Sequence, residues 1–176
     1  MAFNLTDKQR ADRKLLLTVV EWNDGSQKRQ LLGHRIESSN IEYNHDITTQ
    51  TDILGENYTD VNKSQPQQSF EPYTITGGDA LAEFLNDKRR RNALSELNVF
   101  TVYVITAFKG SAGEYEAEKH TDCTIVYNSI GGDTKTDMPI TVYFSNKITL
   151  GTVDKLTEDF AFTPDTPATT TTSSQL

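Results

Sequence analysis

Residues 99–129, VFTVYVITAFKGSAGEYEAEKHTDCTIVYNS, decide the fold of this chain. The first ten, residues 99–108, are apolar on both faces, which is typical of a central strand covered from both sides. A Gly-Ser-Ala-Gly turn follows, and residues 114–129 then alternate between apolar and polar side chains. This period of two predicts a second long strand with one buried face and one wet face.

The alternation assigns the side chains of the second strand to two faces. The predicted buried face contains Tyr115, Ala117, Cys123, Ile125 and Tyr127, with Lys119 as an exception. The predicted wet face contains Glu114, Glu116, Glu118, His120 and Asp122. Residues 39–47 alternate in the same way, with Ile41, Tyr43, His45 and Ile47 opposite Asn40, Glu42, Asn44 and Asp46. Two strands are thus expected to carry acids opposite an apolar row.

Further strands and a single helix complete the expected elements. The other expected strands are residues 14–22, 28–36, 66–75, 138–144 and 148–153. The helix spans residues 79–94, with Asp79 as its N-cap. Its apolar face contains Leu81, Phe84, Leu85 and Lys88. About eight strands and one helix predict a mostly-β fold, a β-sandwich or partly closed barrel with one flanking α-helix.

The chain is expected to form one domain, because 176 residues suffice for a single core. That domain spans residues 14–155. Residues 1–13 are polar and charged and are expected to form a flexible N-terminal arm. Residues 156–176 are rich in Pro and Thr and predict a C-terminal arm, because such a composition buries too little apolar surface to order itself.

Residues 48–65 lack a sustained period and are expected to form a long loop. Long loops without secondary structure are uncommon in compact domains and are usually functional. The apolar residues of this loop are isolated, which suggests anchors that become buried only against another subunit. These candidate anchors are Ile53, Leu54, Tyr58 and Val61. The alternative is a mobile surface loop.

Charge and cysteine content exclude several classes. The 25 acidic and 17 basic residues leave a formal charge of −8, which argues against a general nucleic-acid binder. The single cysteine, Cys123, excludes an intrachain disulfide. The N-terminal segment has no apolar core of a secretory signal, and the longest apolar run is too short to span a bilayer. We therefore expect folding in a cytoplasm.

The motifs of the common enzyme classes are missing from the sequence. Glu116, Glu118 and His120 could hold a metal, but a solvated acidic strand face is the favoured interpretation. Cys123 is interpreted as a buried structural thiol. The basic run of residues 88–91 could bind nucleic acid, but cations that meet the carbonyl end of a helix explain it better. No enzyme activity is expected.

The order of several landmarks resembles that of the tail tube (major tail) proteins of long-tailed bacteriophages. The landmarks are an acidic loop, Phe70-Glu71-Pro72-Tyr73, the helix opened by Gly78-Asp79 in GDALAEFLNDKRRRNAL, and the turn SIGGDT. The resemblance covers residues 14–155. It implies a structural virion protein without cofactors.

What this resemblance implies is an assembly as well as a fold. Family members form a β-sandwich with a flanking helix and assemble as hexameric rings stacked into a tube. Their inner sheets join into a continuous β-barrel that lines a channel for DNA, and a long loop early in the chain reaches a neighbouring subunit or ring. The same architecture occurs in contractile tails and in phage-derived injection devices.

The implied partners and location follow from this assembly. The partners are further copies of the chain, the tape-measure protein, and terminator or baseplate proteins. DNA passes through without adhering, and the subunit itself does not insert into a membrane. The implied location is the virion tail, assembled in the cytoplasm of the bacterial host.

Acids that line such a channel would repel DNA phosphates and let the duplex slide. From the alternation, the candidate lumen-lining residues are Glu42, Asp46, Glu114, Glu116, Glu118 and Asp122. This hypothesis uses the expected absence of basic partners on these faces, His120 excepted. An ordinary solvated outer face is the alternative for the same acids.

Two other functions stay open at this point. One is a different virion part of related fold, a tube terminator or a baseplate hub subunit, which need not polymerise. The other is a carbohydrate- or protein-binding β-sandwich module, which would need a cluster of exposed aromatic residues. Trp22 is the only tryptophan, so the sequence supports this second alternative poorly.

Overall fold

The structure is a computed structural model that describes residues 5–36 and 38–165. Its strands are β1 (Leu16–Asn23), β2 (Gln27–Leu32), β3 (Ile41–Glu42), β4 (Asp46–Thr51), β5 (Asn57–Lys63), β6 (Gln67–Phe70), β7 (Phe100–Ser111), β8 (Glu114–Tyr127), β9 (Ile140–Tyr143), β10 (Ile148–Val153) and β11 (Phe162–Pro164). The helix is α1 (Ala80–Arg91), and short 3₁₀ turns lie at Arg13–Leu15 and Leu94–Glu96. The expected mostly-β fold with one flanking helix is confirmed.

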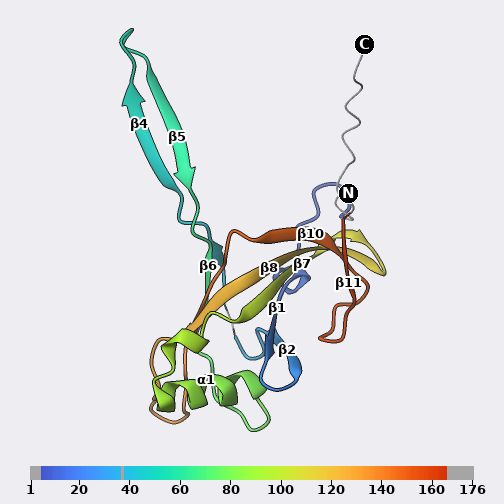
Figure 1. Cartoon of the computed structure of the whole chain (residues 1–176). Coiled ribbons are helices and arrows are strands. Elements are labelled where there is room, and N and C mark those ends of the chain that lie inside the picture. Colours follow the sequence, from blue (N-terminus) through green and yellow to red (C-terminus); the bar gives the residue numbers. More distant parts are fainter. Residues whose placement is uncertain (1–4, 37, 166–176) are drawn as a thin grey trace, which may run out of the picture.

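The two long strands quoted first, β7 and β8, form the centre of the molecule (Figure 1). β7 lies between β1 and β8, and β2 extends the sheet beyond β1. β8 changes its partner along its length, because its first half pairs with β10 and its second half with β9. The order of paired strands is β2-β1-β7-β8-β9-β6-β3. Its two outer strands, β2 and β3, do not pair with each other, so the sheet is open.

A β-bulge in β8 separates its two halves. Phe100 pairs with Cys123 and Val102 pairs with His120, so three steps along β8 match two steps along β7. Asp122 lies in the extra step with a φ of 57°. An added residue reverses which face the later side chains occupy, because the side-chain period of a strand is two.

The bulge makes the expected face assignment of β8 wrong. Tyr115 and Ala117 pack with Tyr103, on one side of the sheet. Cys123 and Ile125 belong to the larger core on the other side. His120, expected on the wet face, is only 5% exposed, and its ring meets the ring of Phe144 at 4.9 Å between centroids.

The larger core lies between the sheet and α1. Trp22, Phe84 and Phe100 contact one another with ring centroids 5.7–6.5 Å apart. The expected apolar face of α1 is confirmed, since Leu81, Phe84, Leu85 and Lys88 are all buried. The capping role of Asp79 is confirmed as well, because its carboxylate accepts the Ala82 backbone N–H at 2.9 Å.

The helix ends earlier than expected, at Arg91 instead of residue 94. Asn92 has a left-handed backbone with a φ of 53°, and its N–H bonds back to the last turn. This is a usual way for a helix to end. Leu94 therefore belongs to the following 3₁₀ turn and not to α1.

A smaller core lies on the opposite side of β7 and is closed by the C-terminal part of the domain. Phe160 is 3% exposed and its ring stands edge-on to Tyr103, with centroids 4.9 Å apart. β11 then pairs with β10. The expected arm at residues 156–176 is thus wrong for residues 156–164, because Phe160 and Phe162 find an aromatic partner in Tyr103. Residues 166–176 lie outside the described chain.

At the N-terminus, Arg13 begins the first 3₁₀ turn, and residues 1–4 lie outside the described chain. The Arg13 guanidinium donates to the Ser39 backbone oxygen at 2.7 Å, so the last residue of the expected arm is tied to the domain. No helix in residues 5–36 and 38–165 has the length and apolarity that crossing a membrane requires.

The expected loop at residues 48–65 is instead part of a β-hairpin. β4 and β5 pair with each other in a separate two-stranded sheet, which extends away from the body at the end opposite α1 (Figure 1). The single strand expected at residues 39–47 is also wrong. Asn44 has a left-handed backbone with a φ of 45°, which separates β3 from β4. Tyr43 and Ile47, expected on a buried face, are 50% and 58% exposed.

Candidate assembly interface

The β4–β5 hairpin is built by local hydrogen bonds. Across its ladder, Thr49 Oγ1 and Thr59 Oγ1 lie 3.2 Å apart, and Thr51 Oγ1 donates to Asn57 Oδ1 at 2.7 Å. At its base, Ser64 Oγ donates to the Tyr43 backbone oxygen at 2.7 Å. Every residue of β5 is exposed. The hairpin is thus ordered by its own ladder and not by the core.

The tip of the hairpin is held in a fixed turn. Asp52 Oδ1 accepts the backbone N–H groups of Leu54 and Glu56 at 2.8 and 2.9 Å. Gly55 follows with a φ of 83°, a conformation that glycine adopts without strain. This turn leaves Ile53 102% exposed and Leu54 81% exposed.

One face of the hairpin has no charged side chain. Strand geometry places Ile47, Thr49 and Thr51 on this face, opposite Val61, Thr59 and Asn57. Val61 is 62% exposed, while Tyr58 lies on the other face, 45% exposed and donating to Gln50. The four candidate anchors, Ile53, Leu54, Tyr58 and Val61, are therefore all accessible, and their contact with another subunit stays a prediction.

Sequence reasoning missed the hairpin, although a signal was present. Residues 46–51 contain three Thr, and residues 46–51 and 57–63 carry Ile47, Tyr58 and Val61 at strand positions. An Asp-Ile-Leu-Gly turn lies between them. The signal was weak because both faces are wet, so the apolar–polar alternation that identifies a half-buried strand is missing.

The six candidate lumen-lining acids do not form one continuous row. Glu42 and Asp46 are exposed near the base of the hairpin, on different sheets. The other four lie on β8. Glu116 and Glu118 border a hollow of about 260 Å³ together with Lys109 and Asp165. Asp122 is separated from them by the bulge.

Three of these acids have cationic or ionisable basic partners. Glu116 lies 2.8 Å from Lys109 Nζ, Glu118 lies 3.3 Å from His120 Nε2, and Asp122 bonds Lys147. Burial acts to raise the pKa of Glu116 and the hydrogen bond and charge of Lys109 act to lower it, and this pKa lies below its ordinary value. The expectation that only His120 opposes these acids is therefore wrong. Their placement in a lumen stays a prediction.

The contacts of His120 and Cys123, which could take part in chemistry elsewhere, are typical of residues that stabilise a fold. His120 Nδ1 faces the Ser145 backbone oxygen at 3.3 Å, and burial raises the pKa of the Cys123 thiol. Within the described residues, no group of His, Cys, Asp and Glu side chains is arranged to hold a metal ion. The trio Glu116, Glu118 and His120 thus lacks the geometry of a metal site.

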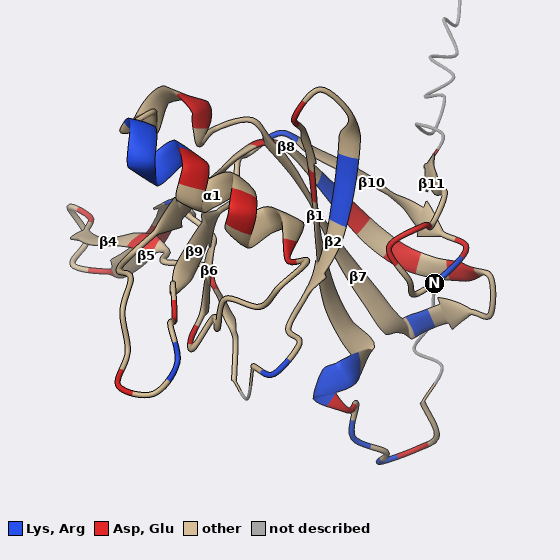
Figure 2. Ribbon diagram, turned by 90° about the horizontal axis from the view of Figure 1, so that it is seen from below, with Lys and Arg blue, Asp and Glu red and all other residues tan. Residues whose placement is uncertain are grey.

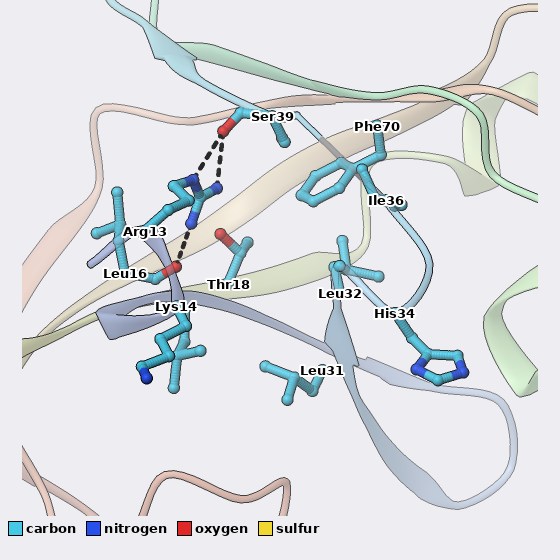
Figure 3. Close-up of a pocket in the computed structure, with 12 residues that line it drawn as sticks. Arg13, Lys14, Leu16, Thr18, Leu31, Leu32, His34, Ile36, Ser39 and Phe70 are labelled. Atoms are coloured by element: carbon cyan, nitrogen blue, oxygen red, sulfur yellow. Dashed lines mark hydrogen bonds between the residues drawn. The ribbon is translucent and has the colours of Figure 1, made fainter.

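A cavity of about 420 Å³ lies beside the ends of β1 and β2. Figure 3 shows Arg13 at its wall, bonded to the backbone oxygens of Ser39 and Leu16. The apolar lining includes Leu32, Ile36 and Phe70. All three guanidinium nitrogens of Arg13 are used by carbonyl oxygens, so this residue acts as a clamp between chain segments.

The last turn of α1 carries four consecutive basic residues, drawn in blue on the ribbon of Figure 2. Lys88 pairs with Glu96 and lies over the Phe84 ring at 4.7 Å, and Arg91 lies 2.6 Å from Asp87. Arg89 bonds the Asn86 side chain. The interpretation of this run as a helix terminus agrees with these contacts.

Comparisons with known proteins give structural similarity alone. No family model matches the chain, and no curated protein sequence matches it. Among solved structures, the tube-terminating cap of an anti-feeding prophage is 13% identical, with 85% of this chain and 95% of that chain covered and a TM-score of 0.48.

Two components of an extracellular contractile injection system are also similar. The sheath/tube terminator in the extended state is 10% identical over 82% of this chain and 99% of that chain, with a TM-score of 0.49. The sheath–tube complex is 13% identical over 84% and 95%, with a TM-score of 0.46. Identities this low, with TM-scores below 0.5, do not carry a conclusion about function.

Proposed function

We propose that this chain is a structural subunit of the tail of a long-tailed phage or of a related injection particle. It acts by joining further copies of itself around the axis of the tail tube. The observation that carries the proposal is the β4–β5 hairpin, which is ordered, exposed, and apolar at its tip.

The hairpin needs a partner for energetic reasons. An isolated two-stranded hairpin is marginally stable in water. Ile53 and Leu54 together present two large apolar side chains to solvent. Burying each against a neighbouring subunit would contribute about 1.5–3 kcal/mol. A neighbouring copy that covers the tip would therefore stabilise both the hairpin and the assembly.

Two finer functions share this basis. A tube subunit would build stacked hexameric rings with an acidic channel for the genome, which the candidate lumen acids would line. A tube terminator would form a single ring at the end of the tube. Both have counterparts among the similar structures named above, which include two terminators and one sheath–tube complex.

The ion pairs of β8 favour the terminator. Glu116 and Asp122 each bond a lysine, and Glu118 faces a histidine, so half of the six candidate acids have a basic neighbour. A lining whose carboxylates are paired with lysines repels DNA less than a lining of six unpaired carboxylates would. A long tube needs a non-adhesive lining along its whole length, and a single terminal ring does not.

Electron microscopy of the purified protein at increasing concentration tests the proposal. Hollow tubes are expected for a tube subunit and single rings for a terminator. A protein that stays monomeric at every concentration would contradict both.

The role of the hairpin is tested separately with a shortened variant. Thr48 and Asp60 are paired across the ladder, so replacing residues 49–59 by Asn-Gly closes the hairpin with a two-residue turn. This variant is expected to stay folded and to lose self-assembly. Ile130→Ser, at an exposed residue outside the hairpin, is the control and should assemble normally.

A further inference from the structure

The two ends of the molecule differ in charge. The described segment from residue 38 to residue 62 contains five acids and no Lys or Arg, and it includes the whole apolar tip of the hairpin. At the opposite end, residues 88–91 are four consecutive cations in a chain whose net charge is −8. Figure 1 shows the hairpin and α1 at opposite ends of the molecule.

The hairpin end offers an acidic and apolar surface, the hairpin tip, which we define as Ile53, Leu54 and Glu56. The carboxylate of Asp52 is used to hold the turn. Glu56 is exposed and its backbone, not its carboxylate, is held by that turn. Its charge is therefore available beside the two apolar side chains.

The α1 end offers the complementary surface, the helix-end patch, which we define as Arg89, Arg90, Arg91 and Leu94. Leu94 is 60% exposed. Lys88 and Arg91 are paired with Glu96 and Asp87, so four cations against two acids leave a surplus of two positive charges.

We propose that the hairpin tip of one copy docks on the helix-end patch of the next copy. Glu56 then meets the arginines of α1, and Ile53 and Leu54 cover Leu94. This inference rests on the proposed function and deepens it, because it names the surface that receives the hairpin. Charge complementarity sets the orientation of the contact and suppresses other pairings, while burial of the apolar residues stabilises it.

The contact joins two different surfaces, one at each end of the molecule. Such a heterologous contact generates a closed ring when the rotation between copies closes, and an open array when it does not. Both outcomes fit a subunit of a tail, so the inference does not depend on the choice between tube and terminator.

A charge swap tests the contact. Glu56→Lys and Arg90→Glu each place like charges across it, and each is expected to raise the protein concentration needed for assembly by about tenfold or more. The double variant restores opposite charges and is expected to assemble at close to the wild-type concentration. Asp133→Lys and Lys135→Glu reverse exposed charges on a different loop, and these controls should assemble like the wild type.

The outcomes separate the inference from the proposed function. If the wild type assembles and the single reversals do not weaken assembly, the inference is overturned and the proposed function stands. If both single reversals weaken assembly and the double variant does not recover, the two surfaces do not meet each other and the inference is again overturned. A wild type that never assembles overturns both.

A second measurement tests whether the helix-end patch binds duplex DNA instead of a hairpin tip. Binding of duplex DNA to the wild type and to Arg90→Glu is measured at low and moderate salt. DNA binding that depends on Arg90, together with unchanged assembly of Arg90→Glu, would assign the patch to a polyanion and overturn the inference.

Discussion

Single residues tie distant segments of this chain together, and Asp79 is the clearest case. Its Oδ1 atom accepts the Ala82 N–H that it caps and also the side chains of Gln30 and Tyr73, at 2.9 and 3.1 Å. The cap was predictable because it involves neighbours in sequence. The contacts with Gln30 and Tyr73 were not, because they depend on where β2 and the segment before α1 pass the start of the helix.

The environment of Tyr73 predicts a loss of stability in alkaline solution. Burial, and then the charge of Asp79, raise the pKa of Tyr73 above its ordinary value of 10.0. The unfolded chain ionises this phenol first, so the stability that it contributes is present below about pH 10 and is lost as the pH rises further. Tyr73→Phe should lower the free energy of unfolding by about 1 kcal/mol at neutral pH, because a hydrogen bond is lost. Above pH 10 this variant should lose less stability than the wild type does.

Urea unfolding of the wild type and Tyr73→Phe across this pH range measures the effect. Tyr143→Phe is the control, because Tyr143 is exposed. Tyr103 also has a raised pKa, from burial and then from Glu21, so part of the alkaline loss should persist in both variants. An identical alkaline loss in the wild type and Tyr73→Phe would contradict the prediction.

At the scale of elements, the C-terminal segment is a structural part of the domain despite its Pro/Thr-rich composition. Phe160 packs against Tyr103, and its backbone oxygen accepts a bond from Arg29 at 2.7 Å. Phe160→Ala should lower the free energy of unfolding by about 3–5 kcal/mol, because it opens a cavity in the smaller core. Chemical denaturation followed by fluorescence measures this change.

Two truncations give the matched comparison for this segment. A chain that ends at residue 165 should unfold like the full chain, and a chain that ends at residue 155 should be destabilised at least as much as Phe160→Ala. Equal stability of the two truncated chains would show that the segment does not close the core.

The face assignments of β8 show where element-level prediction fails. Its existence and length followed from the period of two, which is a local property. The bulge at Asp122 changes that period for one residue, and it occurs where β8 passes from β10 to β9 as its partner. This change of partner depends on how the strands are arranged in the folded chain, so local alternation could not locate the bulge.

At the scale of the whole molecule, the hairpin and α1 give the subunit two different ends. A heterologous contact between these ends predicts that a subunit with one functional end can add to an assembly and stop its growth. The shortened-hairpin variant keeps the helix-end patch. When less than an equal amount of this variant is added to the wild type, it should reduce the length or the number of assemblies.

Light scattering and electron microscopy of the mixtures measure this effect. The Ile130→Ser variant, which has both ends, should co-assemble without reducing growth. If the shortened variant has no effect at any ratio, its helix-end patch does not receive the hairpin of a wild-type copy. The end-to-end arrangement is then wrong.

The sequence by itself determined the mostly-β class, the two central strands, and the capped helix with its buried face. These features follow from periodicity and capping, which involve residues close together along the chain. Only the tertiary structure decided the bulge at Asp122, the packing of Phe160 and the exposed hairpin. The bulge and the packing of Phe160 depend on segments that are far apart in sequence and meet only in the folded chain. The hairpin is local, but both of its faces are wet, so it has no apolar–polar alternation that would have identified it.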